Sequence, residues 1–206
     1  MARQLALSSD TSLAVAGVDE AGRGPLAGPV VAAAVILDDE RPVLGLADSK
    51  RLTPAQRDRV ARAVRTEARA FAIALAEPAE IDSINILEAS LLAMARAIAK
   101  LAIVPALVRV DGLQTPRYSD SALPFEIEAV VRGDESVPAI SAASILAKVC
   151  RDRLMRRWHR RYPAYGFDRH KGYPTPAHIA ALAVHGPCPI HRRTFSPVRD
   201  CLKVPS

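Results

Sequence analysis

Four acidic side chains stand just after three apolar runs of the sequence, and carboxylates in that setting can do chemistry. A side chain just past the end of a strand is held firmly by the sheet and points into the crevice where open sheets usually bind ligands. If the three runs form neighbouring strands, the carboxyl groups converge at one place. The four residues are Asp19, Glu20, Asp111 and Asp134.

The charge of such a cluster indicates what it could bind. Converging carboxylates repel one another, and their pKa values rise unless cations neutralise them. Hard divalent cations with oxygen ligands suit the cluster, Mg²⁺ first and Mn²⁺ next. Two such ions can activate a water molecule and stabilise the leaving oxygen of a phosphodiester, which predicts hydrolysis of a nucleic-acid backbone. Acidic residues after strands are also common in turns, and spacing alone leaves that structural interpretation open.

A glycine-rich segment directly follows the first acidic pair. Residues 21–29 contain three glycines and two prolines, a composition typical of a loop or tight turn. Within it, the sequence Gly22, Arg23, Gly24 allows backbone N–H groups to approach a phosphate closely. The spacing is not that of a P-loop, and a plain tight turn is the alternative interpretation. The position of the segment beside Asp19 and Glu20 favours a role in substrate binding.

The balance of charge favours a polyanionic partner. The 206 residues carry a formal net charge of +6 and have a pI of about 9.6, which suits nucleic acid but also an ordinary basic surface. Tyr173 is a candidate for stacking on a base or sugar. Asp152 lies among arginines and is expected to be solvated or salt-bridged. Two basic stretches either contact phosphates or form solvated helix faces: Lys50, Arg51, Arg57, Arg59, Arg62 and Arg65, and Arg151, Arg153, Arg156, Arg157, Arg160 and Arg161.

The elements that must position these residues follow from hydrophobic periodicity and helix-capping signals. Thr53, Pro54 and Gln56 form a capping box with proline at the first helical position, and Asn85 followed by Glu88 indicates another helix start. Strands come first and helices are interleaved later, which predicts a mixed sheet covered by helices, its first two strands antiparallel. The predicted strands are 13–18, 30–37, 67–76, 106–110 and 125–131, and the predicted helices are 54–66, 85–101, 138–160 and about 175–186.

No clear linker divides the chain, so we predict a single catalytic domain over residues 1–206. Its core spans about 13–160, a helical cap spans about 161–198, and short tails lie at both ends. Residues 1–10 contain no apolar stretch that could serve as a signal peptide. The longest apolar run, 27–37, contains Pro29 and is too short to span a bilayer. We therefore expect a cytoplasmic protein that makes no contact with membranes.

The cysteines support the same compartment. Cys150, Cys188 and Cys201 are too few, and odd in number, for a disulfide framework, which fits a reducing environment. The spacing of Cys188 with His185 and His191 permits a zinc cluster, but no CxxC pair is present. Ordinary loop residues are the favoured interpretation of these three.

Taken in order, the residues resemble the ribonuclease HII family, the type 2 ribonucleases H. The resemblance covers about residues 13–198, and its DEAGRGP and SAASILAKV blocks are highly specific. Two positions depart from the family pattern. Arg132 stands where lysine is frequent, and Pro174 stands where glycine is usual, which restricts Tyr173 toward extended backbone. The matching segments are 17–25, 48–50, 85–89, 110–112, 133–134, 140–149, 170–173 and 191–195.

The resemblance implies an α/β protein with an RNase H-like fold, in which a central mixed β-sheet is flanked by helices and followed by a C-terminal helical extension. It implies an endoribonuclease that hydrolyses the RNA strand of RNA–DNA hybrids and single ribonucleotides embedded in duplex DNA, as in ribonucleotide excision repair. Cleavage on the 5′ side of the ribonucleotide at the RNA–DNA junction would leave 3′-hydroxyl and 5′-phosphate ends.

The resemblance also implies roles for particular residues. The glycine-rich loop would contact the 2′-hydroxyl and the adjacent phosphate, and Tyr173 would pack on the sugar of the following deoxynucleotide. The 2′-hydroxyl is what distinguishes RNA from DNA at one position, so this agrees with the close backbone approach that the glycines allow. The implied catalytic set, which binds Mg²⁺ or Mn²⁺, is Asp19, Glu20, Asp111 and Asp134, and the implied substrate-binding set is Gly22, Arg23, Gly24, Lys50, Ser144, Lys171 and Tyr173.

Two other functions stay open at the level of sequence. One is a different RNase H-like metal nuclease, such as a type 1 ribonuclease H or a resolvase, and the glycine-rich loop and Tyr173 argue against it. The other is a basic nucleic-acid-binding protein without catalysis, and the presence of all four acidic residues argues against it. We expect a monomer whose partners are RNA–DNA hybrids and ribonucleotide-containing duplex DNA.

Overall fold

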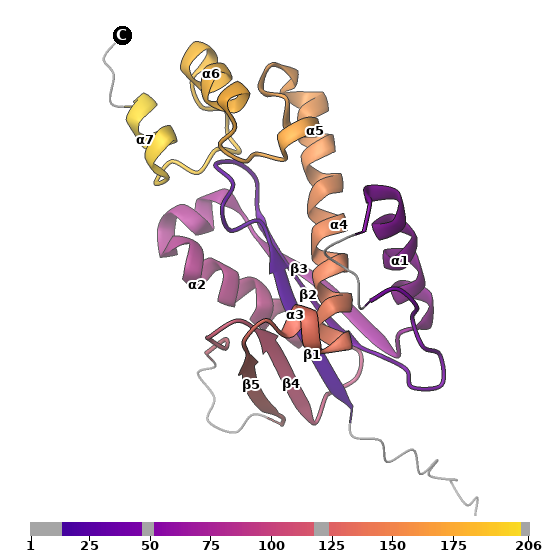
Figure 1. Ribbon diagram of the computed structural model, residues 1–206. Helices are drawn as coiled ribbons and strands as arrows, with labels where there is room; N and C mark the ends of the chain where they lie inside the picture. Colours follow the sequence, from indigo (N-terminus) through magenta and orange to yellow (C-terminus); the bar gives the residue numbers. More distant parts are fainter. Residues whose placement is uncertain (1–13, 47–51, 118–123, 203–206) are drawn as a thin grey trace, which may run out of the picture.

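Five strands form one mixed sheet in the described residues, 14–46, 52–117 and 124–202, of this computed structural model (Figure 1). They are β1 (Val15–Ala21), β2 (Val30–Ile36), β3 (Ala70–Ala76), β4 (Leu107–Asp111) and β5 (Glu126–Val130). Their order is β3-β2-β1-β4-β5, with β1 antiparallel to β2 and parallel to β4. The predicted mixed sheet and its antiparallel first pair are confirmed.

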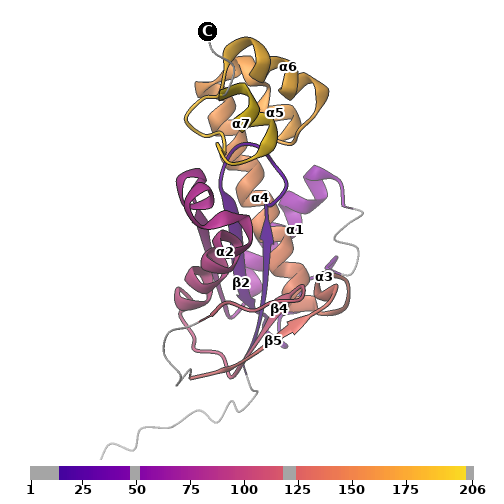
Figure 2. The same ribbon diagram turned by 90° about the vertical axis from the view of Figure 1, so that its left-hand side faces the viewer.

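Helices cover both faces of this sheet. Helix α2 lies against one face, and α1 and α4 lie against the other, while α5, α6 and α7 gather at one end of the molecule (Figures 1 and 2). The prediction lacked α3, α5 and α7, which are short. The helices are α1 (Pro54–Glu67), α2 (Pro78–Ala99), α3 (Gly133–Ser136), α4 (Pro138–Arg161), α5 (Phe167–His170), α6 (Pro176–His185) and α7 (Ser196–Leu202). None of the helices described is long and apolar enough to cross a bilayer.

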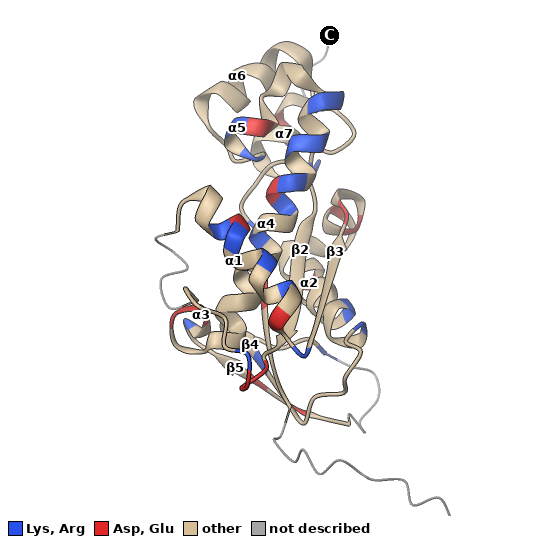
Figure 3. Ribbon diagram, turned by 90° about the vertical axis from the view of Figure 1, so that its right-hand side faces the viewer, with Lys and Arg blue, Asp and Glu red and all other residues tan. Residues whose placement is uncertain are grey.

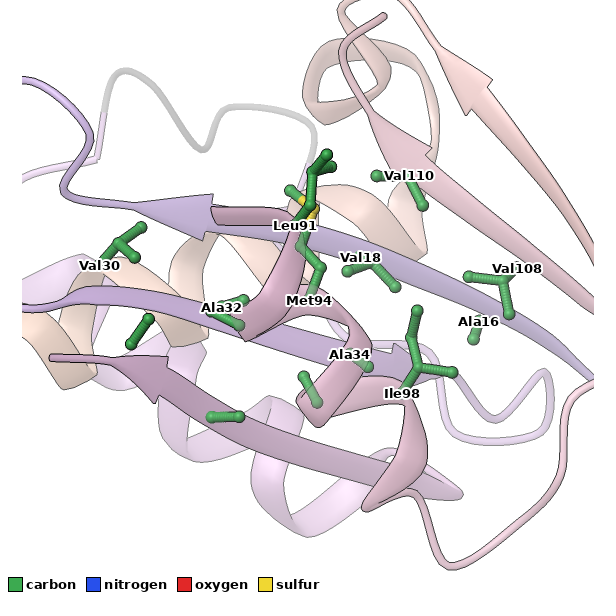
Figure 4. Close-up of a cluster of buried hydrophobic side chains, with 14 of the residues drawn as sticks. Ala16, Val18, Val30, Ala32, Ala34, Leu91, Met94, Ile98, Val108 and Val110 are labelled. Carbon is green, nitrogen blue, oxygen red and sulfur yellow. The ribbon is translucent and has the colours of Figure 1, made fainter. Parts of the chain in front are cut away.

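The hydrophobic core has two layers because both faces of the sheet are covered. Strand β2 is buried along its whole length, as expected for a strand between two helical layers. On the α2 side, Leu91, Met94 and Ile98 pack against the sheet (Figure 4). The three residues follow the helical period within the predicted helix 85–101, so one side of that helix faces the sheet.

A glycine sets how closely α4 approaches the sheet. A Cβ atom at Gly17 would lie 2.1 Å from the carbonyl carbon of Ala139 and 2.2 Å from the nitrogen of Ile140. The backbone at the start of α4 therefore crosses directly over β1, where a side chain would not fit. This contact carries the following turns of α4 past the C-terminal end of β1, where Asp19 and Glu20 lie.

Helix α2 bends at Asn85, whose backbone is not helical (φ 68°, ψ 168°). The side-chain oxygen of Asn85 accepts hydrogen bonds from the backbone N–H groups of Leu87 (2.9 Å) and Glu88 (3.1 Å). Asn85 is thus the cap at which a helical segment starts, as predicted, but the prediction lacked the segment before it. An earlier helical segment begins at Pro78, and its own capping residue is Glu77.

Substitutions at Asn85 can separate the cap from the backbone strain. Asn85→Ala is expected to lower the free energy of unfolding by about 1 kcal/mol, because the capping side chain is lost. Asn85→Gly loses the same cap, but glycine adopts this backbone region freely, so it should exceed the alanine variant in stability by about 1–2 kcal/mol. Urea denaturation of the three proteins measures both differences. Equal stabilities of the two variants would contradict a strained backbone at Asn85.

The C-terminal helices are attached to the loop between β1 and β2. The backbone of Leu26 donates to Gly172 (2.8 Å) and accepts from Arg192 (2.8 Å), and Gly28 donates to Ile190 (2.8 Å). We call the segment 162–202, with α5, α6 and α7, the cap. Because these bonds join the cap to the segment 21–29, the glycine-rich loop is held between the sheet and the cap.

Candidate active site

The ends of three neighbouring strands bring the acidic residues together. Asp19 follows Val18, the partner of Val110 in the parallel pair of β1 and β4, and Asp111 ends β4. Asp134 lies on α3, directly after β5, and its backbone N–H donates to Oδ1 of Asp111 (3.2 Å). The predicted neighbourhood of the three strand ends is confirmed, although Asp134 lies on a short helix and not simply past a strand.

Asp19 is the most buried of the four acidic residues, with 6% of its surface exposed. Burial, together with the charges of Glu20 and Asp111, raises the pKa of the Asp19 carboxyl well above its ordinary value. Hydrogen bonds from the side chain of Ser144 and from the backbone N–H of Glu20 (2.7 Å) act in the opposite direction. Asp19 therefore lies where a carboxylate is unfavourable unless a cation stands beside it.

The chemistry of these donors fits a hard divalent cation. Carboxylate oxygens are the ligands that such ions prefer, and a bound cation would remove the repulsion that Asp19 experiences. Among the residues that the structure describes, no three His, Cys, Asp or Glu side chains already stand in the arrangement of a metal site. The charges of Glu20 and Asp111 act on Asp19, so a cation beside these three carboxyl groups would favour their charged forms.

The glycine-rich loop lines a hollow beside the acidic residues. The hollow has a volume of about 320 Å³. An adjoining hollow of about 330 Å³ shares Glu20 and Arg23 with it and also contains Asp111. The two hollows thus form one continuous surface from the loop to the end of β4. The residues that line the first hollow are Glu20, Ala21, Gly22, Arg23, Gly24, Ser144, Lys148, Arg151 and Tyr173.

Most of the predicted substrate-binding residues meet in this hollow. Tyr173 is 43% exposed and its ring lies near Gly24, so Pro174 does not turn the ring away from the loop. Lys171 is different, because its ammonium group donates to the carbonyl of Asp168 within its own turn and is not part of the lining. Burial is also the main cause that lowers the pKa of Lys171. Lys50 lies outside the described residues.

Two buried arginines hold the glycine-rich loop from behind, and sequence reasoning missed them. Arg192, 0% exposed, donates to the carbonyl oxygens of Gly28 (3.0 Å), Arg23 (2.8 Å) and Gly22 (2.5 Å). Arg151, 1% exposed, donates to the carbonyl oxygens of Pro29, Ala27 and Lys171, each at 3.0 Å. These bonds draw the loop carbonyls inward, toward the interior of the protein. We call Arg151 and Arg192 the guanidinium pair.

A sequence pattern indicated burial for only one arginine of the guanidinium pair. Arg151 lies four residues from Ala147 and four from Met155, both buried, so the buried period of α4 runs through it. The run of arginines around it favoured a surface role instead. Arg192 lies in an irregular part of the cap, where no periodicity indicates which side chains face inward. Burial lowers the pKa of Arg151 to about 10 and that of Arg192 to about 9, so both remain cationic at neutral pH.

The remaining basic residues mostly lie at the surface of α1 and α4 (Figure 3). Arg153 forms an ion pair with Asp58 of α1 (2.8 Å), which joins the two helices. Asp152 forms an ion pair with Lys148 (2.9 Å), so its predicted salt-bridged role is confirmed. Lys148 itself lines the hollow, which the sequence analysis had not assigned to it. Both helices thus carry exposed arginines, and Lys148 of α4 lines the hollow itself.

The zinc cluster that the spacing of Cys188, His185 and His191 left open is not formed. Cys188 and His191 contact each other (Sγ to Nδ1, 3.1 Å), while His185 packs against the ring of Tyr165. Within the described part of the chain, these three side chains therefore do not form a group that could hold a metal ion. All three cysteines are free thiols.

A mixed five-stranded sheet of this order with helices on both faces is the RNase H-like fold. The family model described as Ribonuclease HII matches residues 16–198. The chain therefore belongs to the ribonuclease HII family, whose activity is the cleavage of RNA in RNA–DNA hybrids and at embedded ribonucleotides, with the help of a divalent metal.

Individual relatives agree with this assignment. Ribonuclease HII 2 of Methylibium petroleiphilum is 58% identical over 200 residues, which cover 97% of this chain and 90% of that protein. Ribonuclease HII of Cupriavidus necator is 60% identical over 189 residues, 90% of this chain and 77% of that protein. The crystal structure of ribonuclease H2 from Pyrococcus horikoshii OT3 has a TM-score of 0.73 at 31% identity, covering 91% of this chain and 96% of that one.

Proposed function

We propose that Asp19, Glu20, Asp111 and Asp134 are the catalytic residues of this ribonuclease HII and that they hold Mg²⁺ or Mn²⁺. The observation that supports this most is the position of Asp19, which is buried beside two further carboxylates at the ends of parallel strands. The bound metal would activate the attacking water and stabilise the leaving oxygen. Cleavage would fall on the 5′ side of the ribonucleotide and leave 3′-hydroxyl and 5′-phosphate ends.

The residues around the carboxylates would keep them oriented. The Ser144 hydroxyl donates to Asp19, and the backbone N–H of Asp134 donates to Asp111. Arg23 lies 3.3 Å from Glu20, so its guanidinium can shift between this carboxylate and an incoming phosphate. These contacts set the directions of the acidic oxygens before substrate arrives, which reduces the reorganisation needed during the reaction.

The glycine-rich loop would recognise the ribose. Its carbonyls are engaged by the guanidinium pair on the inner side, which leaves the outer side free for the 2′-hydroxyl and the adjacent phosphate. Tyr173 would pack on the sugar of the following deoxynucleotide. Ser144, Lys171 and Lys50 are proposed as further substrate contacts. For Lys171 this requires that its ammonium group leave the carbonyl of Asp168.

The setting of the reaction is proposed from the same features. Residues 1–206 would form a single catalytic domain, since α4 runs unbroken from the sheet into the cap. The free thiols suit the cytoplasm, and the protein would act as a monomer. The basic surface of α1 and α4 would follow the backbone of the RNA–DNA hybrid or of ribonucleotide-containing duplex DNA.

The direct test is cleavage of a labelled DNA duplex that contains one ribonucleotide, with Mg²⁺, Mn²⁺ or EDTA. We expect a cut 5′ to the ribonucleotide with either metal and none with EDTA. A long RNA–DNA hybrid and the all-DNA duplex serve as the two comparison substrates. Cleavage of the long hybrid alone would favour a type 1 specificity, and metal-independent binding without any cut would favour a non-catalytic nucleic-acid-binding protein.

A further inference from the structure

Two buried histidines in the cap form a hydrogen-bonded chain that ends at the backbone of Tyr173. His178 (0% exposed) and His191 (2% exposed) face each other with their Nε2 atoms 3.1 Å apart. Nδ1 of His178 lies 2.9 Å from the carbonyl oxygen of Tyr173. Nδ1 of His191 lies 3.0 Å from the backbone nitrogen of Cys188, 3.1 Å from its Sγ and 3.3 Å from its carbonyl oxygen. We call His178 and His191 the imidazole chain.

The partners of the two rings determine where each proton lies. A carbonyl oxygen only accepts, so Nδ1 of His178 carries the hydrogen that is donated to Tyr173. Nδ1 of His191 faces both the N–H and the carbonyl oxygen of Cys188, so these contacts alone do not place its hydrogen. Because Nε2 of His178 is bare, the two Nε2 atoms form a hydrogen bond only when the hydrogen of the His191 ring lies on Nε2, and Nδ1 then accepts from the N–H of Cys188. Nε2 of His191 then donates to the bare Nε2 of His178. Every bond in the chain has one donor and one acceptor, and both rings are neutral.

The surroundings of the imidazole chain favour these neutral rings. His170 stacks on His178 with ring centroids 4.4 Å apart, and the ring of Tyr165 lies 4.9 Å from that of His191. Burial raises the pKa values of the Tyr165 hydroxyl and the Cys188 thiol, so neither supplies a negative charge. Burial, with His178 and His170, lowers the pKa of His191 to about 4.

The imidazole chain meets the substrate hollow at Tyr173. The carbonyl of Tyr173 also accepts a hydrogen bond from the backbone of Thr175 (2.8 Å), the residue that caps α6 and on whose helix His178 lies. Two donors from one helix therefore fix the peptide that follows Tyr173. Because this peptide is fixed, the direction in which the Tyr173 side chain leaves the backbone toward Gly24 is fixed as well.

We propose that the imidazole chain positions Tyr173 for its contact with the substrate, and that His178 is a positioning residue for the ribonucleotide-specific reaction. The proposal rests on the proposed function of Tyr173 as the residue that packs on the sugar. In this proposal the imidazole chain, which lies behind the binding surface, connects the packed interior of the cap to Tyr173 through hydrogen bonds between neutral rings.

The test uses variants that differ in which of the two hydrogen bonds of His178 they retain. His178→Asn retains an N–H near the position of Nδ1 but cannot accept from His191, whereas His178→Leu loses both bonds. His185→Asn is the matched control, because His185 is an exposed cap histidine outside the imidazole chain. kcat and KM are measured on the single-ribonucleotide duplex and on the long hybrid, and thermal unfolding shows whether each variant folds.

We expect His178→Leu to lose about 10- to 100-fold in kcat/KM on the single-ribonucleotide duplex, a scale that misplacement of a substrate contact produces. His178→Asn should recover most of the loss, and His185→Asn should match the unaltered protein. In a Tyr173→Ala background, His178→Leu should not lower kcat/KM any further, because the two residues act through one contact with the substrate.

Each other outcome has a distinct meaning. A Tyr173→Ala variant with unchanged kcat/KM on the single-ribonucleotide duplex would overturn the proposed role of Tyr173 itself. An impaired Tyr173→Ala variant beside fully active His178 variants would overturn the role of the imidazole chain alone. A loss in His178→Leu that persists undiminished in the Tyr173→Ala background would assign His178 a merely structural role. If His178→Leu does not fold, the comparison of His178→Asn with His185→Asn in both backgrounds decides the question.

Discussion

Replacing Asp19 with asparagine is expected to abolish cleavage while making the metal-free protein more stable. The loss of activity should reach at least about 10²-fold, the scale for removing one preorganised electrostatic group from an active site. The gain in stability follows because asparagine removes a buried charge that lies beside Glu20 and Asp111. Opposite effects on activity and stability are typical of residues that are retained for chemistry at a cost to the fold.

The pH dependence has a definite sign. The pKa of Asp19 is raised in the folded protein, so the folded state holds this proton more tightly than the unfolded state. The Asp19 carboxyl therefore lowers the free energy of unfolding as the pH rises above the ordinary aspartate pKa near 3.8. Below that pH the carboxyl is protonated in both states, and this cost is smallest. The difference in unfolding midpoint between Asp19→Asn and the unaltered protein should widen with rising pH.

Thermal unfolding with EDTA and with Mn²⁺, beside the cleavage assay, measures both effects. Mn²⁺ should raise the midpoint of the unaltered protein, because a ligand that binds only the folded state stabilises it, and should raise that of Asp19→Asn much less. Asp111→Asn should likewise lose activity and most of the response to Mn²⁺. Asp58→Asn, on α1 and away from the site, is the control and should keep both. An active Asp19→Asn variant, or one with an unaltered metal response, would remove Asp19 from the catalytic set.

The position of Asp19 could be predicted because a strand buried on both faces appears as a continuous apolar run. Such a run ends where charge begins, which places the first carboxylate at the edge of the sheet. Asp111 ends β4, whose burial alternates and which contains Arg109, so only the apolar residues around Arg109 indicated that strand. Asp134 needed more than this rule. Arg132 takes a left-handed conformation (φ 54°) and starts α3, and only the folded chain shows that the N–H of Asp134 reaches Asp111.

The cap was harder to predict, for a physical reason. Helices as short as α5 and α7 are not stable alone, and they form here because tertiary contacts hold them. Asp82 of α2 accepts from the backbone N–H groups of Arg193 and Thr194, each at 2.9 Å, and so fixes the chain just before α7. Contacts between residues so far apart in sequence leave no local pattern, and the same holds for Arg192 and for the imidazole chain.

Replacing Arg192 with methionine is expected to lower the free energy of unfolding by about 3 kcal/mol and to reduce cleavage at least about tenfold. The carbonyls of Gly22, Arg23 and Gly28 would lose their donor, and each buried polar group left without a partner costs about 1–3 kcal/mol. Methionine also removes a buried charge that lies near Arg151, which offsets part of the loss. Activity falls because the loop that meets the ribose loses three of its inner bonds.

Arg192→Lys separates charge from geometry. Lysine keeps the cation, but one ammonium group does not reproduce the planar fork that reaches three carbonyls, so it should recover only part of the stability. Arg193→Met is the matched control, because Arg193 is the next residue and its side chain is exposed. Substitutions at exposed positions usually change the free energy of unfolding by no more than about 0.5 kcal/mol. Urea denaturation measures the stabilities, and kcat/KM on the single-ribonucleotide duplex measures the state of the loop. An Arg192→Met protein with full activity and unaltered stability would mean that water satisfies the three carbonyls and that the loop keeps its shape without the guanidinium pair.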